Sequence, residues 1–316
     1  MFDTFANLFV FEILKIEPGR VFDIAQFFIA DALKISILMI AVIFVISFIR
    51  TYLPTDRLKK FFLSSRFGSA YFLAAILGAV TPFCSCSSIP LFLGFLEAGA
   101  GTGVAFAFLA TSPLVNEVVF AVMLGNFGWQ IAAAYALGGI ILGVAAGIIL
   151  QKFLGKKIET TKSGENIFGT QSDLPKIFSE RIKYSARRAV NIFRQMWWII
   201  LIGIAIGAAI HGLVPAEFFL EILGEKSKIW GVPVAVILGL PIYARSASIV
   251  PIIFALTTKG LPLGTALALM MSSAGLSLPE AVMLKKLISW RELGSFFGIV
   301  ALGVILLGLI FNFVSF

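Results

Sequence analysis

The most unusual stretch of the sequence is Thr81-Pro-Phe-Cys-Ser-Cys-Ser-Ser-Ile-Pro90, which holds both cysteines of the chain, Cys84 and Cys86. Paired thiolates favour Cu(I), zinc and similar thiophilic atoms. Two sulfurs alone do not complete the four-ligand set of a structural metal site. The cysteine pair therefore predicts transient capture of a thiophilic solute, with no resident metal ion and no other cofactor.

Two other interpretations of Cys84 and Cys86 remain open at this point. Buried free thiols often behave as small hydrophobic side chains and have no further role. A pair of cysteines separated by one residue can also form a strained disulfide and take part in thiol–disulfide exchange. The second interpretation predicts a membrane oxidoreductase that exchanges electrons with a thioredoxin-like partner.

The prolines of the same stretch, Pro82 and Pro90, predict a break in the helix. A proline lacks a backbone donor and disfavours helix at the residue before it. The hydroxyls of Ser85, Ser87 and Ser88 would then bind either the freed backbone groups or a permeating solute. The alternative is that these small polar residues ease helix packing in the membrane.

A second polar stretch, Tyr243-Ala-Arg245-Ser-Ala-Ser248, lies between two apolar segments. An ionisable residue at membrane depth is energetically costly and normally faces a cavity or the protein interior. Arg245 is therefore predicted to hold an anionic part of the solute or a carboxylate, with Tyr243, Ser246 and Ser248 beside it. The alternative is an arginine at a helix end whose guanidinium reaches the membrane interface.

Two glutamates follow similar strings, Thr111-Ser-Pro-Leu-Val-Asn-Glu117 and Ser272-Ser-Ala-Gly-Leu-Ser-Leu-Pro-Glu280, the second with two residues inserted. Each string has a hydroxyl pair, a proline and then a glutamate that opens the next helix. A buried glutamate could take up and release a proton, so Glu117, Glu280 and the neighbouring Asn116 are predicted to couple or gate transport. A first-turn glutamate that only stabilises its helix dipole is the alternative.

The elements that would position these residues are membrane helices. Of the 316 residues, 59% are hydrophobic and 13% are charged, whereas soluble domains are about 45–50% apolar and about 25% charged. A span needs about 20 apolar residues. Four segments satisfy this requirement, namely 27–49, 128–151, 196–214 and 293–315. The prediction is an all-α integral membrane protein with the lipid bilayer around it.

Between these spans the apolar sequence is divided into short pieces, which suit broken or re-entrant helices lining a site. The predicted pieces are 68–83, 88–97, 103–112 and 113–126, followed by 229–242, 247–258, 262–274 and 278–288.

The chain also repeats itself internally. A shift of 161 residues brings Gly78 onto Gly239, Pro90 onto Pro251 and Trp129 onto Trp290. One constant shift that holds from Gly78 to Trp129 predicts two homologous halves. The predicted boundaries are residues 1–151 for the first membrane repeat, 152–189 for a basic cytoplasmic linker and 190–316 for the second membrane repeat.

The net charge of +8 agrees with membrane orientation and does not require a nucleic-acid partner. Segment 50–66 has five basic residues and one acid, and segment 152–194 has ten basic residues. Lys and Arg mark the cytoplasmic side. The counterpart of the first segment, 212–228, has three glutamates and two lysines, which places it outside. Equivalent segments on opposite sides predict inverted halves, with the broken helices meeting near the membrane midplane.

The strings Thr81–Pro90 and Leu109-Ala-Thr-Ser-Pro-Leu-Val-Asn-Glu117 resemble those of the predicted permease family that includes YraQ and the organoarsenical efflux permease ArsP. The resemblance covers essentially the whole chain. It implies a multi-pass permease of the cell inner membrane, with ArsP-like members exporting trivalent organoarsenicals through cysteine contacts. Only Cys84 and Cys86 could take that role here, because the sequence has two cysteines. Arg245 stands where the repeat would place a cysteine, which is a departure from the arsenical pattern.

The sequence thus predicts a secondary transporter rather than an enzyme, with a small thiophilic, sulfur-containing or organoarsenical-like solute. The chain has no Gly-x-x-x-x-Gly-Lys-Ser/Thr loop for ATP. The predicted driving force is therefore an ion gradient or the gradient of the solute itself.

Overall fold

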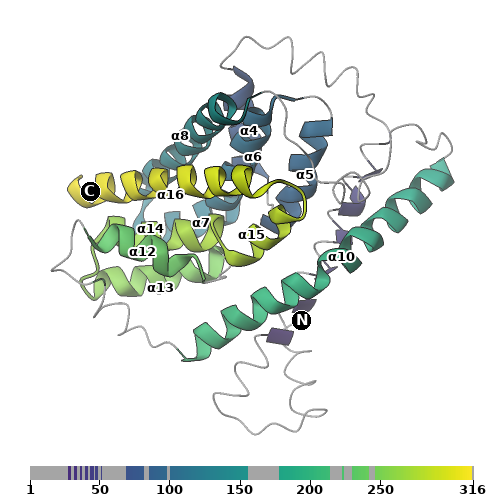
Figure 1. The fold of residues 1–316 in the computed structure, drawn as a ribbon. Helices are drawn as coiled ribbons and strands as arrows, with labels where there is room; N and C mark the ends of the chain where they lie inside the picture. The colour runs from purple at the N-terminus through teal and green to yellow at the C-terminus, as the bar shows by residue number, and fades with distance from the viewer. Residues whose placement is uncertain are drawn as a thin grey trace, which may run out of the picture.

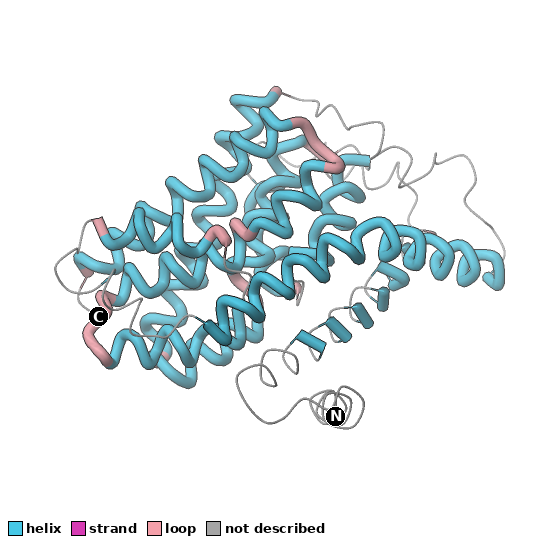
Figure 2. Tube along the Cα trace, turned by 60° about the horizontal axis from the view of Figure 1, so that its bottom comes forward, coloured by secondary structure: helices cyan, strands magenta, loops and turns pink. Residues whose placement is uncertain are grey.

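The protein is described from a computed structural model, shown as a ribbon in Figure 1 and as a tube in Figure 2. The structure describes residues 69–81, 85–97, 100–155, 178–213, 230–241 and 246–314, together with Leu223 and separate positions between 28 and 51. These residues form helices and short connections, with no strand among them. The all-helical prediction is confirmed for the described part of the chain.

The first run of helices corresponds to the first predicted repeat. It consists of α4 (Ser69–Val80), α5 (Ser85–Glu97), α6 (Thr102–Leu114), α7 (Glu117–Phe127) and α8 (Trp129–Leu154). A long helix, α10 (Phe178–Leu213), follows and lies along one side of the bundle in Figures 1 and 2. The second run consists of α12 (Gly231–Gly239), α13 (Ser246–Thr258), α14 (Leu263–Gly275), α15 (Leu278–Lys285) and α16 (Trp290–Phe313).

Each of the eight short apolar pieces predicted from the sequence corresponds to one short helix. Among the described residues, three segments are long and apolar enough to cross a membrane, namely Trp129–Leu154, Leu263–Lys285 and Trp290–Phe313. Helices α6 and α7 pass the same test as a pair bent by 41°. The predicted spans 128–151 and 293–315 are confirmed as α8 and α16.

Two predicted segments relate differently to the structure. Within the span 27–49 the structure describes separate positions only, and each of them is helical. Most of the span 196–214 lies in the carboxyl-terminal part of α10. Helix α10 also continues without a break through residues 189 and 190, so the predicted end of the linker falls inside a helix.

Four of the five pairs of corresponding helices begin at one constant spacing. The pairs Ser85 and Ser246, Thr102 and Leu263, Glu117 and Leu278, and Trp129 and Trp290 start corresponding helices, each pair 161 residues apart. Packing follows the same correspondence, because α6 lies against α4, α5 and α8 while α14 lies against α12, α13 and α16.

Glycines bring the central helix of each run close to the following long helix. In the first run the Gly103 N–H donates to Gln151 Oε1 over 2.8 Å. In the second the Gly264 N–H donates to Asn312 Oδ1, also over 2.8 Å. A Cβ on Gly103 would clash with the carbonyl oxygen of Gly147, and a Cβ on Gly264 would clash with that of Gly308. Residues at corresponding positions therefore bring α6 close to α8 in the first run and α14 close to α16 in the second.

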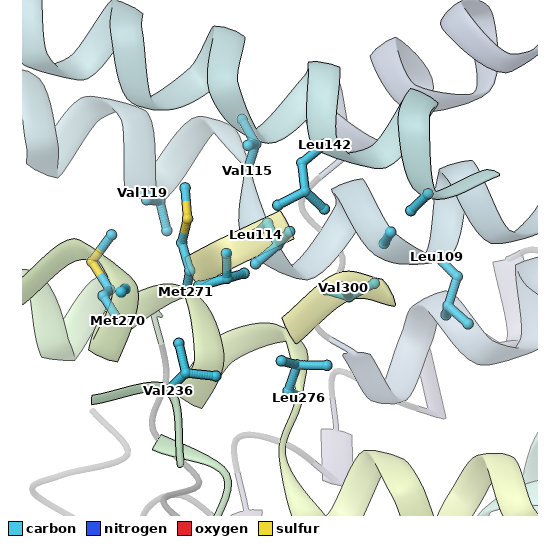
Figure 3. Packing of buried hydrophobic residues seen from close by; sticks show 14 of the residues in the cluster. Leu109, Leu114, Val115, Val119, Leu142, Val236, Met270, Met271, Leu276 and Val300 are labelled. Atoms are coloured by element: carbon cyan, nitrogen blue, oxygen red, sulfur yellow. The ribbon is translucent and has the colours of Figure 1, made fainter. Parts of the chain in front are cut away.

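The two runs are joined through one hydrophobic core. Leu114 at the end of α6 packs on Gly275 at the end of α14, and Leu142 of α8 packs on Gly303 of α16. Figure 3 shows side chains of both runs in this cluster, including Leu114, Leu142 and Met271. Cross-contacts also join α7 to α13 and α5 to α15, so each run packs its short helices on the other.

Candidate functional site

The break predicted around the two cysteines is present. Helix α4 ends at Val80, and the Thr81 hydroxyl donates to the Leu77 carbonyl over 2.7 Å at this end. Helix α5 begins at Ser85, so Ser85, Cys86 and Ser87 form its first turn. Cys84 lies outside the described residues. The first turn of a helix presents backbone N–H groups and the positive end of the helix dipole.

Ser88 is the residue of this stretch whose contact is best defined. Its side chain is fully buried, and its Oγ lies 2.7 Å from Ser112 Oγ in the last turn of α6. A hydrogen bond between two buried hydroxyls joins neighbouring helices. This contact places the amino-terminal end of α5 beside the carboxyl-terminal end of α6. Ser112 was not singled out from the sequence as a partner of Ser88.

In the second run α13 begins at Ser246, so Ser246 and Ser248 occupy the turn that corresponds to Ser85 and Ser87. Tyr243 and Arg245 lie outside the described residues.

The predicted coupling residues lie at two further helix starts. Asn116 is the N-cap of α7, and its Oδ1 accepts from the Val119 N–H over 2.8 Å. Glu117, the first residue of α7, is exposed. Glu280 is the third residue of α15 and is 1% exposed. Both glutamates lie in a first turn, as predicted, but their surroundings differ.

The helix starts also change which residues correspond between the halves. Because α7 and α15 begin 161 residues apart, Asn116 corresponds to Ser277 and Glu117 to Leu278. Glu280 then corresponds to Val119, and no two-residue insertion is needed. The sequence strings pair Glu117 with Glu280 only when two residues are inserted, and the constant spacing of the helix starts does not support that pairing.

Several helix ends converge where the halves meet. The contact between Leu114 and Gly275 joins the carboxyl-terminal ends of α6 and α14. Helices α7 and α15 each begin three residues after this contact. The start of α5 lies beside the last turn of α6 through Ser88 and Ser112. Broken helices that meet inside a bundle are the usual surroundings of a transported solute.

Comparison with known proteins identifies the family of the chain. Residues 21–313 match the model of a family described as predicted permease. The chain belongs to this predicted permease family. It is therefore a multi-pass membrane permease.

Curated relatives are similar along most of the chain. UPF0718 protein MJ0584 of Methanocaldococcus jannaschii is 24% identical over 307 residues, which cover 78% of this chain and 84% of the relative. UPF0718 protein YraQ of Escherichia coli is 25% identical over 263 residues, 83% of this chain and 73% of the relative. No solved structure gives a significant match.

Proposed function

We propose that this permease is a secondary transporter that moves a small thiophilic, sulfur-containing or organoarsenical-like solute across the inner membrane. The observation that carries the proposal is the start of α5. Cys86 lies in its first turn, beside the end of α6 and hence near the junction of the two halves. Thiol chemistry, open backbone donors and a break in a membrane helix thus coincide at one place.

We further infer that the two halves have inverted topology. Leu142 packs on Gly303, and Gly138, four residues earlier in α8, lies against Leu307, four residues later in α16. The two corresponding long helices therefore run antiparallel. Inverted repeats require this relation between corresponding spans.

The distribution of charge supports the same topology. Helix α8 ends at Leu154, just before the basic segment 156–194. The antiparallel helix α16 begins beside Lys285, Lys286 and Arg291. Both basic ends then lie on one side of the membrane, which the positive-inside preference makes cytoplasmic. The opposite corner, residues 118–134 around the start of α8, has no charged residue.

Cysteine labelling tests the topology directly. The double variant Cys84→Ser/Cys86→Ser removes both native thiols. Into this background single cysteines are placed at Gln130 and Arg291, which are exposed and correspond in the two halves. A membrane-impermeant maleimide added to intact cells should label Gln130→Cys, whereas Arg291→Cys should react only after permeabilisation. Labelling of both from the same side would contradict inversion.

Within the proposed site, Cys84 and Cys86 contact the soft atom of the solute, with the hydroxyls of Ser85, Ser87 and Ser88 nearby. Arg245 holds an anionic part, beside Tyr243, Ser246 and Ser248. Asn116, Glu117 and Glu280 couple or gate the movement. Support for this assignment comes from the matching first turns of α5 and α13 and from the contact between the carboxyl-terminal ends of α6 and α14.

The solute assignment is tested with proteoliposomes containing purified protein. Uptake of trivalent arsenicals and of sulfur-containing anions is compared between the wild type and the Cys84→Ser, Cys86→Ser and double variants. Transport of the true solute should fall at least tenfold in the double variant, with an unchanged Tm in the absence of solute. Full transport by the double variant would remove the cysteines from the site.

The redox state of the thiols separates the proposal from a thiol–disulfide oxidoreductase. In a transporter, Cys84 and Cys86 should remain available to a maleimide throughout turnover. A disulfide that forms and is reduced by a thioredoxin-like protein during each cycle would instead favour the oxidoreductase.

A further inference from the structure

Two helices of the second half begin with the same four-residue pattern. Ser277-Leu-Pro-Glu280 opens α15, and Ser289-Trp-Arg-Glu292 opens α16. Serine at the N-cap and glutamate three residues later predict a capping box, in which each side chain accepts a hydrogen bond from the backbone of the other residue. The chain thus contains two copies of one local motif, twelve residues apart.

The box is complete in α16 and absent in α15. At α16 the Ser289 N–H donates to Glu292 Oε2 over 2.8 Å, and the Glu292 N–H donates to Ser289 Oγ over 3.4 Å. Ser277 makes no side-chain capping bond. The backbone permits one, because φ and ψ are −71° and 149° at Ser277 and −71° and 161° at Ser289. Local geometry therefore does not explain the difference.

Ser277 is also fully buried, with an exposed fraction of 0%. Its Oγ has no hydrogen-bond partner among the described residues. Burial of a hydroxyl without a partner costs about 1–3 kcal/mol, and such groups in native proteins call for an explanation such as an ion or a functional role. Glu280, one helical turn further along, is buried as well.

The carboxyl-terminal ends of two other helices meet this point. Helix α14 ends at Gly275, two residues before Ser277, and the Leu278 N–H donates over 3.1 Å to the carbonyl of Leu240, the C-cap of α12. Carboxyl-terminal helix ends present carbonyl oxygens and partial negative charge. Hydroxyl, carboxylate and carbonyl oxygens at a break in a membrane helix are the ligands that coupling cations use in transporters.

We propose that Ser277 Oγ and the Glu280 carboxylate, with carbonyl oxygens at the end of α14, bind an alkali cation, and that Na⁺ is the ion that drives transport. Oxygen-only donors suit a hard ion rather than a soft one. The Ser277 hydroxyl is then kept out of a capping box so that it can serve as a ligand. The driving role rests on the proposed transport function, whereas cation binding does not.

The test measures cation binding on the purified full-length protein without any solute. Tm and radioactive ²²Na⁺ binding are recorded in NaCl, KCl and choline chloride of equal ionic strength. Na⁺ should raise Tm relative to choline, because a ligand that binds only the folded state stabilises it. Ser277→Ala should weaken the apparent Na⁺ affinity about tenfold, Ser277→Thr should retain it, and Glu280→Gln should abolish the response.

The capping box of α16 supplies matched controls. Ser289→Ala and Glu292→Gln should lower Tm equally in all three salts and leave the Na⁺ response intact. A Tm that does not distinguish NaCl from choline chloride, or a Na⁺ response that survives Glu280→Gln, would overturn the proposal. A larger response to KCl than to NaCl would retain the alkali site but exclude Na⁺ as the driving ion.

Failure of this inference is distinguishable from failure of the proposed function. Solute transport that persists without Na⁺ binding leaves a permease driven in another way. Na⁺ binding that persists when no thiophilic solute is transported leaves the cation site and removes the solute assignment.

Discussion

The two halves of the permease are alike where helices approach closely and different where helices break. The Gly103 N–H binds a glutamine oxygen and the Gly264 N–H binds an asparagine oxygen at the corresponding position, both over 2.8 Å. Glutamine is longer than asparagine by one methylene, yet the close approach is the same. A pair of glycines fixes the distance between backbones, and the polar side chain adapts to it.

The helix breaks show the opposite behaviour. Asn116 caps α7 with its side chain, whereas the corresponding Ser277 is buried and caps nothing. Similarly, Tyr135 of α8 donates to the Leu114 carbonyl over 2.7 Å, whereas its counterpart in α16 is Phe296, which has no hydroxyl. The shared packing supports the scaffold, and the differences concentrate where transport chemistry is proposed.

The largest effect is expected from the shared glycines. Gly264→Ala would drive a Cβ into the carbonyl oxygen of Gly308, and Gly103→Ala would do the same at Gly147. Backbone atoms cannot move aside as a flexible side chain can. The free energy of unfolding of each variant should therefore fall by about 3 kcal/mol. The measurement is Tm in detergent. Gly294→Ala is the control, because nothing lies within 4 Å of the added carbon, and its Tm should not fall.

If the Tm values of Gly103→Ala and Gly264→Ala fell by very different amounts, the close helix contacts at these two glycines would not be equivalent. A small loss in both would show that the helices can separate without cost, contrary to the close contact of their backbones.

A smaller loss of stability is expected from Tyr135→Phe, which gives the first half the residue that the second half has at the corresponding position, Phe296. Tyr135→Phe keeps the ring in the core but removes the donor to Leu114, whose carbonyl lies at the end of α6. An acceptor left buried without its bond costs about 1–3 kcal/mol. Tm should fall accordingly. An unchanged Tm would mean that another donor replaces the tyrosine hydroxyl at this helix end.

The sequence predicted the pieces of the bundle well, since prolines, glycines and apolar runs act locally. The break between Val80 and Ser85 and the two long spans α8 and α16 followed from such signals. Ser277 could not be identified in this way. Its pattern is that of an ordinary capping box, and only the structure shows that the box is not formed. Likewise the bond between Ser88 and Ser112 joins residues of two helices, and composition does not predict such a pair.

The smallest change in stability is expected at the two N-cap residues, Asn116 and Ser277, and their alanine variants can be compared directly. Asn116→Ala removes a capping bond to the Val119 N–H and should cost about 1 kcal/mol. Ser277→Ala removes a hydroxyl that caps nothing, so in choline chloride its Tm should equal that of the wild type or rise slightly, because a buried polar group without a bond is relieved. Equal losses in the two variants would show that Ser277 caps α15 in solution. A loss for Asn116→Ala alone would instead confirm that the two halves use their helix breaks differently, one for stability and the other with a hydroxyl left available for a ligand.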